Sequence, residues 1–196
     1  MLDAGCGPGI YAEWLCDRGA ELLAIDVTPE MVDLTRKRVG ERATVRRADL
    51  DEPLDFCQDG SFDLVVCPLV LDYLGNWAPV FAEFARVLAP GGSLVFSSGH
   101  PFADFLFCRD RLGLDVNYFD VELFEARWGG FGEPRPLVRS FRRSLSDILN
   151  PLARAGFVLD TILEPRPIAG FEELDAESYA RLLREPGFLC VRARRA

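Results

Sequence analysis

Short apolar runs alternate with longer stretches of helical period along residues 1–98. The runs are rich in aliphatic and β-branched side chains, which is typical of buried strands. They predict strands at residues 1–4, 21–25, 44–47, 62–67 and 93–98. Because strands that alternate with helices form parallel sheets with crossover helices, we expect an α/β fold with a doubly wound sheet.

Three helices are expected between these strands. Residues 10–18 have helical period, and residues 28–39 begin with Thr28 as a predicted N-cap and end before Gly40. Residues 77–88 carry one apolar stripe, which we assign to the core and which is formed by Val80, Phe81, Phe84 and Leu88.

The alternation stops at residues 99–143, an insertion rich in aromatic side chains. It contains Phe102, Phe105, Phe107, Tyr118, Phe119, Phe124, Trp128 and Phe131. Long insertions in compact folds are often functional, so we expect a lid that either encloses a substrate or only packs on its own domain. A helix at 144–155 and strands at 157–163 and 188–194 follow. No linker or repeat divides the chain, which predicts one domain over residues 1–196.

The chain has 22 basic and 31 acidic residues, hence a formal net charge of -9. This charge repels a phosphate backbone, which argues against a nucleic-acid partner and favours a small-molecule substrate. No apolar run approaches the roughly 20 residues of a membrane span, and the first residues lack a secretory signal. We therefore expect no membrane contact and a cytoplasmic location. Six scattered cysteines without a CxxC pair, and a single histidine, argue against a metal site.

A glycine-rich loop follows the first predicted strand in Leu2-Asp3-Ala4-Gly5-Cys6-Gly7-Pro8-Gly9. Glycines let the chain turn sharply and present backbone N–H groups and a helix N-terminus to a ligand. A dinucleotide fingerprint G-x-G-x-x-G that starts at Gly5 requires a third glycine at position 10, where the chain has Ile10. The spacing therefore argues against NAD.

Acidic residues close the next two predicted strands. Asp26 ends the second strand, and Asp49 follows the third in Ala48-Asp49-Leu50. In doubly wound sheets, ligands bind outside the carboxyl ends of the strands. We therefore expect Asp3, Asp26, Asp49 and Cys67 to converge on one ligand.

With these motifs, the sequence resembles class I S-adenosylmethionine-dependent methyltransferases over nearly all of residues 1–98. Phe62-Asp63-Leu64-Val65-Val66-Cys67 and Leu88-Ala89-Pro90-Gly91-Gly92-Ser93-Leu94 are similar to later motifs of that family. The resemblance implies S-adenosylmethionine as cofactor and S-adenosylhomocysteine as product. It places the methionine part against the loop with Gly5, Cys6, Gly7 and Gly9, the ribose hydroxyls on Asp26, and the adenine amino group on Asp49. Asp3, Leu50 and Cys67 are further candidates for cofactor binding.

The second half resembles a bacterial branch of the family that acts on small molecules. The similar segments are Ser98-Gly99-His100-Pro101-Phe102, Arg143-Ser144-Leu145-Ser146-Asp147, Leu152-Ala153-Arg154-Ala155-Gly156-Phe157 and Glu164-Pro165. The family's topology makes the last strand an antiparallel insert between the fifth and sixth strands. We expect the same arrangement here, in a Rossmann-like sheet that is otherwise mostly parallel.

Methyl transfer from a sulfonium depends mainly on alignment of the reacting atoms, and a general base adds less. His100, at the end of the fifth strand, is the first candidate for that base; alternatively, its ring only fixes the turn before Pro101 by hydrogen bonding. Asp72 and Tyr73 follow the fourth strand and are expected to face the same pocket. Tyr118 and Arg143 are candidate acceptor ligands, although an arginine in this basic segment is often simply solvated.

The sequence thus predicts a methyltransferase that acts on oxygen or nitrogen of a small molecule. The motifs of nucleic-acid methyltransferases are absent, because Cys67 precedes Pro68 where a cytosine-modifying enzyme has proline before its cysteine. A nicotinamide-dependent oxidoreductase is a weaker alternative, since Lys37 is the only lysine and no Tyr-x-x-x-Lys pair exists. A non-catalytic protein that binds S-adenosylmethionine, or a partner subunit, remains a second alternative.

The first predicted strand begins at Met1, whereas proteins that resemble this chain carry a helical segment before it. We therefore expect a site that is open on one side, in a chain that is N-terminally shortened or that depends on a partner subunit or a homodimer.

Overall fold

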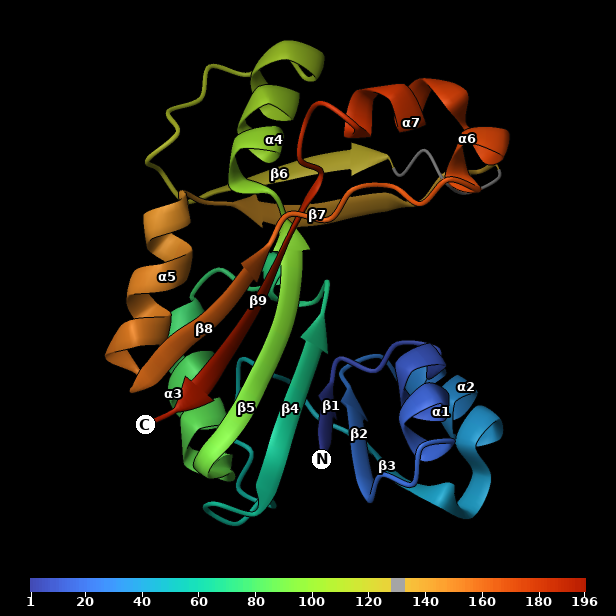
Figure 1. Ribbon diagram of the computed structural model, residues 1–196, viewed down its shortest axis with the longest axis vertical. Coiled ribbons are helices and arrows are strands. Elements are labelled where there is room, and N and C mark those ends of the chain that lie inside the picture. The colour runs from blue at the N-terminus through green and yellow to red at the C-terminus, as the bar shows by residue number, and fades with distance from the viewer. Residues whose placement is uncertain (128–132) are drawn as a thin grey trace.

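The computed structural model describes residues 1–127 and 133–196 and contains a seven-stranded sheet in the order β3-β2-β1-β4-β5-β9-β8. Its first five strands run parallel (Figure 1). They are β1 (Leu2–Ala4), β2 (Leu22–Asp26), β3 (Ala43–Arg47), β4 (Phe62–Pro68) and β5 (Leu88–Gly99). β9 (Phe188–Arg195) is antiparallel to β5 and to β8 (Phe157–Leu163), between which it lies. The expected sheet and the antiparallel insert are confirmed.

Helices cover both faces of the sheet over two separate cores. On one face, Leu22 and Ala24 of β2 pack with residues of α1 (Ile10–Cys16). On the other face, Leu2 of β1 and the buried strands pack against α3 (Trp77–Val87) and α5 (Leu145–Arg154). Alternate residues of each strand point to opposite faces, so the two cores confirm the doubly wound architecture.

Helix boundaries agree with the sequence within a turn, with two differences in detail. α2 (Pro29–Val39) begins after Thr28 as expected, but the Thr28 side chain makes no capping hydrogen bond. The backbone N–H of Thr28 instead donates to Asp26 Oδ1 at 2.9 Å. β5 begins at Leu88, which was predicted as helical, because Leu88 pairs with Phe62 before a register shift in the ladder.

The insertion is more regular than the sequence predicts. It contains α4 (Pro101–Leu106), a turn at Phe107–Arg111, and a hairpin of β6 (Glu122–Arg127) and β7 (Leu137–Arg142). The predicted lid aromatics Trp128 and Phe131 lie outside the described residues. Phe102, Phe105 and Tyr118 form a ring cluster with centroids 5.7–6.5 Å apart.

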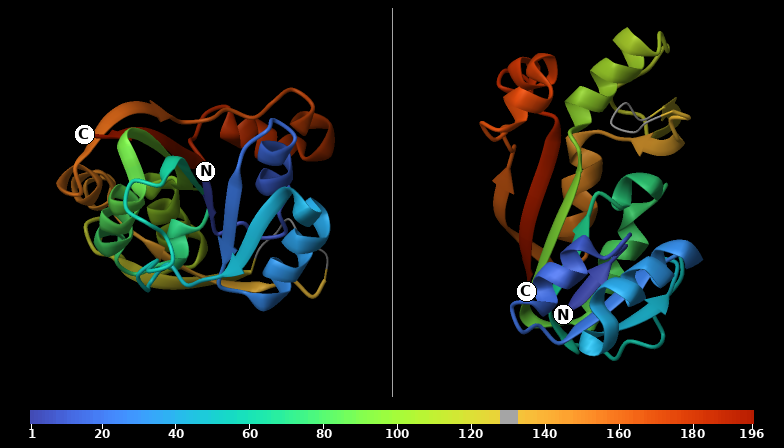
Figure 2. Two further views of the ribbon diagram at one scale, coloured as in Figure 1. Left: turned by 90° about the horizontal axis from the view of Figure 1, so that it is seen from below. Right: turned by 90° about the vertical axis from the view of Figure 1, so that its right-hand side faces the viewer.

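Two further helices lie between β8 and β9, where the sequence predicts no element. They are α6 (Phe171–Leu174) and α7 (Ala176–Leu182). Figure 1 and the right view of Figure 2 place them with α4 and the β6–β7 hairpin beyond the carboxyl ends of β4 and β5. The end of the sheet where ligands are expected is therefore covered by two segments that are distant in sequence.

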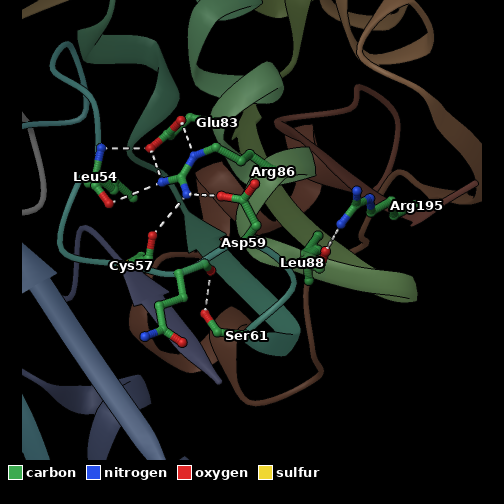
Figure 3. A network of polar contacts seen from close by, with 9 residues as sticks. Leu54, Cys57, Asp59, Ser61, Glu83, Arg86, Leu88 and Arg195 are labelled. Atoms are coloured by element: carbon green, nitrogen blue, oxygen red, sulfur yellow. Dashed lines mark hydrogen bonds and ion pairs between the residues drawn. The ribbon is translucent and has the colours of Figure 1, made fainter.

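The connection from β3 to β4 contains no α-helix and is held by Arg86 of α3 (Figure 3). The Arg86 guanidinium donates to the carbonyl oxygens of Leu54 at 3.1 Å and Cys57 at 2.8 Å. It also pairs with Glu83 and Asp59, both at 2.6 Å, and Glu83 accepts the Leu54 N–H at 2.7 Å. This network fixes the loop that follows Asp49. Within the described ranges, no helix is long and apolar enough to cross a membrane.

Candidate cofactor and acceptor site

Asp26 pins the glycine-rich loop to the end of β2. Its Oδ2 accepts the Gly7 N–H at 2.9 Å, and its Oδ1 accepts the Thr28 N–H at the start of α2. The N–H groups of Gly5 and Cys6 both donate to Ile25 O at 2.8 Å. The loop is therefore held in a fixed shape before any ligand binds, and each Asp26 oxygen keeps a lone pair for a further donor.

Close packing explains two glycines of this loop. Gly5 has φ +82°, and a Cβ there would lie 2.3 Å from Val70 Cγ2. Gly9 has φ +84°, and its Cβ would lie 2.9 Å from Thr35 Oγ1. Thr35 is fully buried in α2, and its hydroxyl donates to Gly7 O at 2.7 Å. Sequence reasoning missed Thr35, because a threonine inside a helix carries no distinctive signal.

Asp3 is fully buried in β1, beside the loop. Neither of its carboxyl oxygens has a hydrogen-bond partner in the described part of the chain. Burial raises the pKa of Asp3 to about 7, and the charge of Asp26 adds to this effect. A cationic donor at this position would stabilise the ionised carboxylate, so the site fits the ammonium group of an amino-acid ligand.

The other predicted cofactor residues are placed less directly. The Ala48 N–H donates to Asp26 O at 3.0 Å, which brings the Asp49 turn beside the end of β2. Asp49 is exposed, and its Oδ1 accepts the Asp51 N–H at 3.0 Å. Leu50 packs against the core. The Cys67 side chain lies entirely in the core, which raises its thiol pKa, so only its backbone can face a ligand.

Burial also raises the thiol pKa of Cys6, to about 11. Its sulfur lies 3.5 Å from Thr35 Oγ1, so Cys6 is a packing residue of the loop rather than a reactive thiol.

A cavity of about 610 Å³ lies at the carboxyl ends of β4 and β5, under the insertion. Its lining includes Leu69, Asp72, Tyr73, Gly99, Asp104 and Phe124. The residue after Leu69 is Val70, which packs against Gly5, so the cavity adjoins the glycine loop. Leu69 has φ 55°, a strained backbone conformation of the kind that often occurs at functional sites.

Asp72 and Tyr73 come together at this cavity, in a 3-10 turn at Leu71–Tyr73. Asp72 Oδ2 accepts the Gly99 N–H at 2.9 Å, and burial raises the pKa of Asp72 to about 6. Asp104 also lines the cavity, with a pKa raised to about 7 by burial and by the charge of Asp72. Sequence reasoning missed Asp104, because its helix was not predicted.

His100 does not line this cavity. Its ring is mostly buried, and Nε2 lies 2.8 Å from Glu164 Oε1, at the end of β8. The geometry favours the alternative in which the ring holds the turn before Pro101. The role of His100 as a general base stays a prediction that this placement does not support.

Tyr118 and Arg143 also lie outside the cavity lining. The Tyr118 hydroxyl accepts the Leu145 N–H at 3.1 Å, at the start of α5. Arg143 is buried, stacks over Trp77 at 4.2 Å and donates from Nη2 to Leu74 O at 2.6 Å. The expectation of a solvated arginine is wrong, because Arg143 is buried and its hydrogen bond to Leu74 O holds the chain just after the Asp72 turn. Neither residue is brought to the acceptor cavity.

Comparisons with known proteins agree with this fold. Residues 2–96 match a family model described as a methyltransferase domain. The chain is 37% identical to ubiquinone biosynthesis O-methyltransferase of Xanthomonas oryzae pv. oryzae over 101 aligned residues. The aligned stretch covers 50% of this chain and 42% of that protein. The chain thus matches less than half the length of such relatives.

Two crystal structures extend the likeness to the whole chain. An S-adenosylmethionine-dependent methyltransferase from Mesorhizobium loti is 26% identical, with a TM-score of 0.76 over 99% of this chain and 89% of that one. A Listeria monocytogenes protein assigned to the same class is 20% identical, with a TM-score of 0.81 over 100% and 89%. The likeness to the Listeria structure supports the fold, including α4, the β6–β7 hairpin, α6 and α7.

Proposed function

We propose that this chain is a class I S-adenosylmethionine-dependent methyltransferase that methylates a small-molecule acceptor, which the match of residues 2–96 to a methyltransferase domain and the likeness to the Mesorhizobium loti enzyme support. The observation that carries the proposal is the junction of two sites at one edge of the sheet. A glycine loop beside the buried Asp3 carboxyl group, which has no hydrogen-bond partner among the described residues, adjoins a cavity lined by the partly buried Asp72.

When bound, S-adenosylmethionine supplies an electrophilic methyl group on a sulfonium. The residues of the chain would bind the cofactor and the acceptor and orient them for the transfer. Asp3 would accept hydrogen bonds from the amino-acid ammonium, and the remaining lone pairs of Asp26 would accept from the ribose hydroxyls. The Asp49 turn lies beside them for the adenine. The cavity aligns the acceptor and excludes water, which is the largest contribution that a protein makes to this displacement.

Calorimetry with S-adenosylhomocysteine tests the proposal. Asp26→Ala should weaken binding about ten- to hundredfold, because it removes a charged acceptor and releases the Gly7 N–H that holds the loop. Asp33→Asn, an exposed acid of α2, is the matched control and should bind as wild type does. Equal affinities of wild type and Asp26→Ala would refute the site, and tighter binding of NAD would favour the oxidoreductase alternative.

A non-catalytic protein that binds S-adenosylmethionine is the second candidate. The acids that line the neighbouring cavity, whose pKa values are raised, support catalysis over binding alone, since a sensor needs no proton acceptor there. The acceptor atom, oxygen or nitrogen, a homodimer or partner subunit, and a cytoplasmic location remain predictions. Methyl transfer to a library of small metabolites would separate enzyme from sensor.

A further inference from the structure

Two partly buried carboxyl groups lie beside Gly99 in the lining of the acceptor cavity. Asp72 follows β4 and accepts the Gly99 N–H at 2.9 Å. Asp104 lies in α4, after β5, and a Cβ on Gly99 would lie 2.5 Å from its Oδ2. Both side chains line the same cavity with Gly99. Elements that are distant in sequence therefore bring two acids beside one glycine.

The hydrogen bonds of the described residues give the Asp104 side chain no structural task. Its position in the first turn of α4 suits a capping carboxylate, but its own N–H donates to His100 O, and the His100 N–H donates to Gly187 O. Among the described residues, the Asp104 carboxyl group makes no hydrogen bond and no ion pair. The charge of Arg143 acts on Asp72, but the Arg143 guanidinium donates from Nη2 to Leu74 O and does not line the cavity.

Two adjacent carboxylates in a site of low polarity repel each other, and each loses hydration. One proton shared by the pair reduces this cost in the free protein. A ligand with a cationic hydrogen-bond donor lowers the cost of repulsion and lost hydration further, because the donor neutralises charge and supplies several N–H groups at once. A hydroxyl group supplies one hydrogen bond and no charge.

The rest of the cavity defines the body of the ligand. Phe107, Phe124, Val138 and Phe188 give it largely apolar walls. Arg127 and Arg181 also reach the cavity, but both are exposed and form its rim. The cavity lining therefore combines two carboxyl groups with largely apolar side chains.

We propose that the acceptor is an amine with an apolar body, whose amino group is held between Asp72 and Asp104 and whose nitrogen receives the methyl group. This inference rests on the proposed function and names its substrate class. One carboxylate accepts a proton from the ammonium form, which leaves a neutral amine. The nitrogen lone pair then forms the N–C bond as the C–S bond breaks and its electron pair stays on sulfur. The product leaves as an N-methylammonium ion, and the carboxyl group returns its proton to water.

Three probes of one shape test the proposal: phenethylamine, 2-phenylethanol and phenylacetate, each titrated by calorimetry into the complex with S-adenosylhomocysteine. Phenethylamine should bind tightest of the three. Asp104→Asn should weaken it about tenfold or more, since a charged hydrogen bond is lost. Asp115→Asn, an exposed acid in the same insertion, is the matched control and should bind as wild type does.

Each other outcome overturns the proposal. No phenethylamine binding, or equal binding by 2-phenylethanol, removes the preference for an amine. Tightest binding of phenylacetate would show that Arg127 and Arg181, and not the two acids, determine which ligand the cavity prefers. Unchanged phenethylamine affinity in Asp104→Asn removes that residue from the site.

Affinity for S-adenosylhomocysteine, measured first in each variant, separates two failures. If the wild type does not bind S-adenosylhomocysteine, the proposed function is refuted. If it binds S-adenosylhomocysteine but not the amine, only this inference is refuted. If Asp104→Asn fails to fold, Asp72→Asn carries the same expectation.

Discussion

The buried Asp3 carboxyl group makes stability depend on pH in a way that one isosteric substitution can isolate. Its pKa in the folded protein is about 7, against an ordinary value of 3.8. Between these two values, the folded state holds a proton that the unfolded state has released. Stability therefore falls as the pH rises from about 4 to about 7 and is level above that range. Asp3→Asn keeps the shape of the side chain and removes this loss.

The displaced pKa of Asp3 corresponds to at most about 4 kcal/mol of stability at alkaline pH. We expect Asp3→Asn to be more stable than wild type at about pH 8 and its advantage to shrink by about 2–3 kcal/mol at about pH 5, where the folded wild type is protonated. The same variant should bind S-adenosylhomocysteine more weakly, because the ammonium loses its negatively charged partner.

Urea unfolding of both proteins at the two pH values measures this advantage. Asp33→Asn, which replaces an exposed acid, should show no pH-dependent difference from wild type. An advantage of Asp3→Asn that is the same at both pH values would refute the reasoning, as would a lower stability of that variant at the higher pH.

Three further predictions follow from individual contacts. Gly9→Ala places a Cβ 2.9 Å from Thr35 Oγ1 at φ +84°, so it should cost about 1–3 kcal/mol in urea unfolding, and unchanged stability would contradict the packing. Arg86→Ala should cost about 2 kcal/mol, because it leaves the carbonyl groups of the β3–β4 loop without their donor; an unchanged urea midpoint would show that the network contributes nothing. His100→Ala should lower the melting temperature through the lost contact with Glu164 and keep turnover within about threefold, whereas a loss of about 100-fold or more would restore His100 as the base.

The sequence predicts the sheet because strand and helix periods are local patterns. The strands of residues 1–98, the helix expected at 144–155 and the antiparallel last strand are all confirmed. The hairpin at β6 and β7 was missed although both strands alternate, because a glycine-rich stretch between them hides the pairing. α6 and α7 were missed because short polar helices carry little periodic signal.

The cofactor side of the site is more predictable than the acceptor side. The glycine loop, Asp3 and Asp26 lie within one contiguous motif and the strand that follows it, so their proximity follows from the fold. The acceptor cavity depends on how α4 and the hairpin fold back over β4 and β5. That tertiary arrangement decides that Asp104 faces the cavity and that His100 meets Glu164 instead.

A crystal structure of the protein with S-adenosylhomocysteine tests the central claim most directly. The account predicts ribose hydroxyls within hydrogen-bond distance of the Asp26 carboxylate, the ligand ammonium on Asp3, and the sulfur facing the cavity at Asp72 and Tyr73. Density for the ligand at the opposite end of the sheet, in the hollow lined by Met1, Glu21 and Thr44, would contradict it.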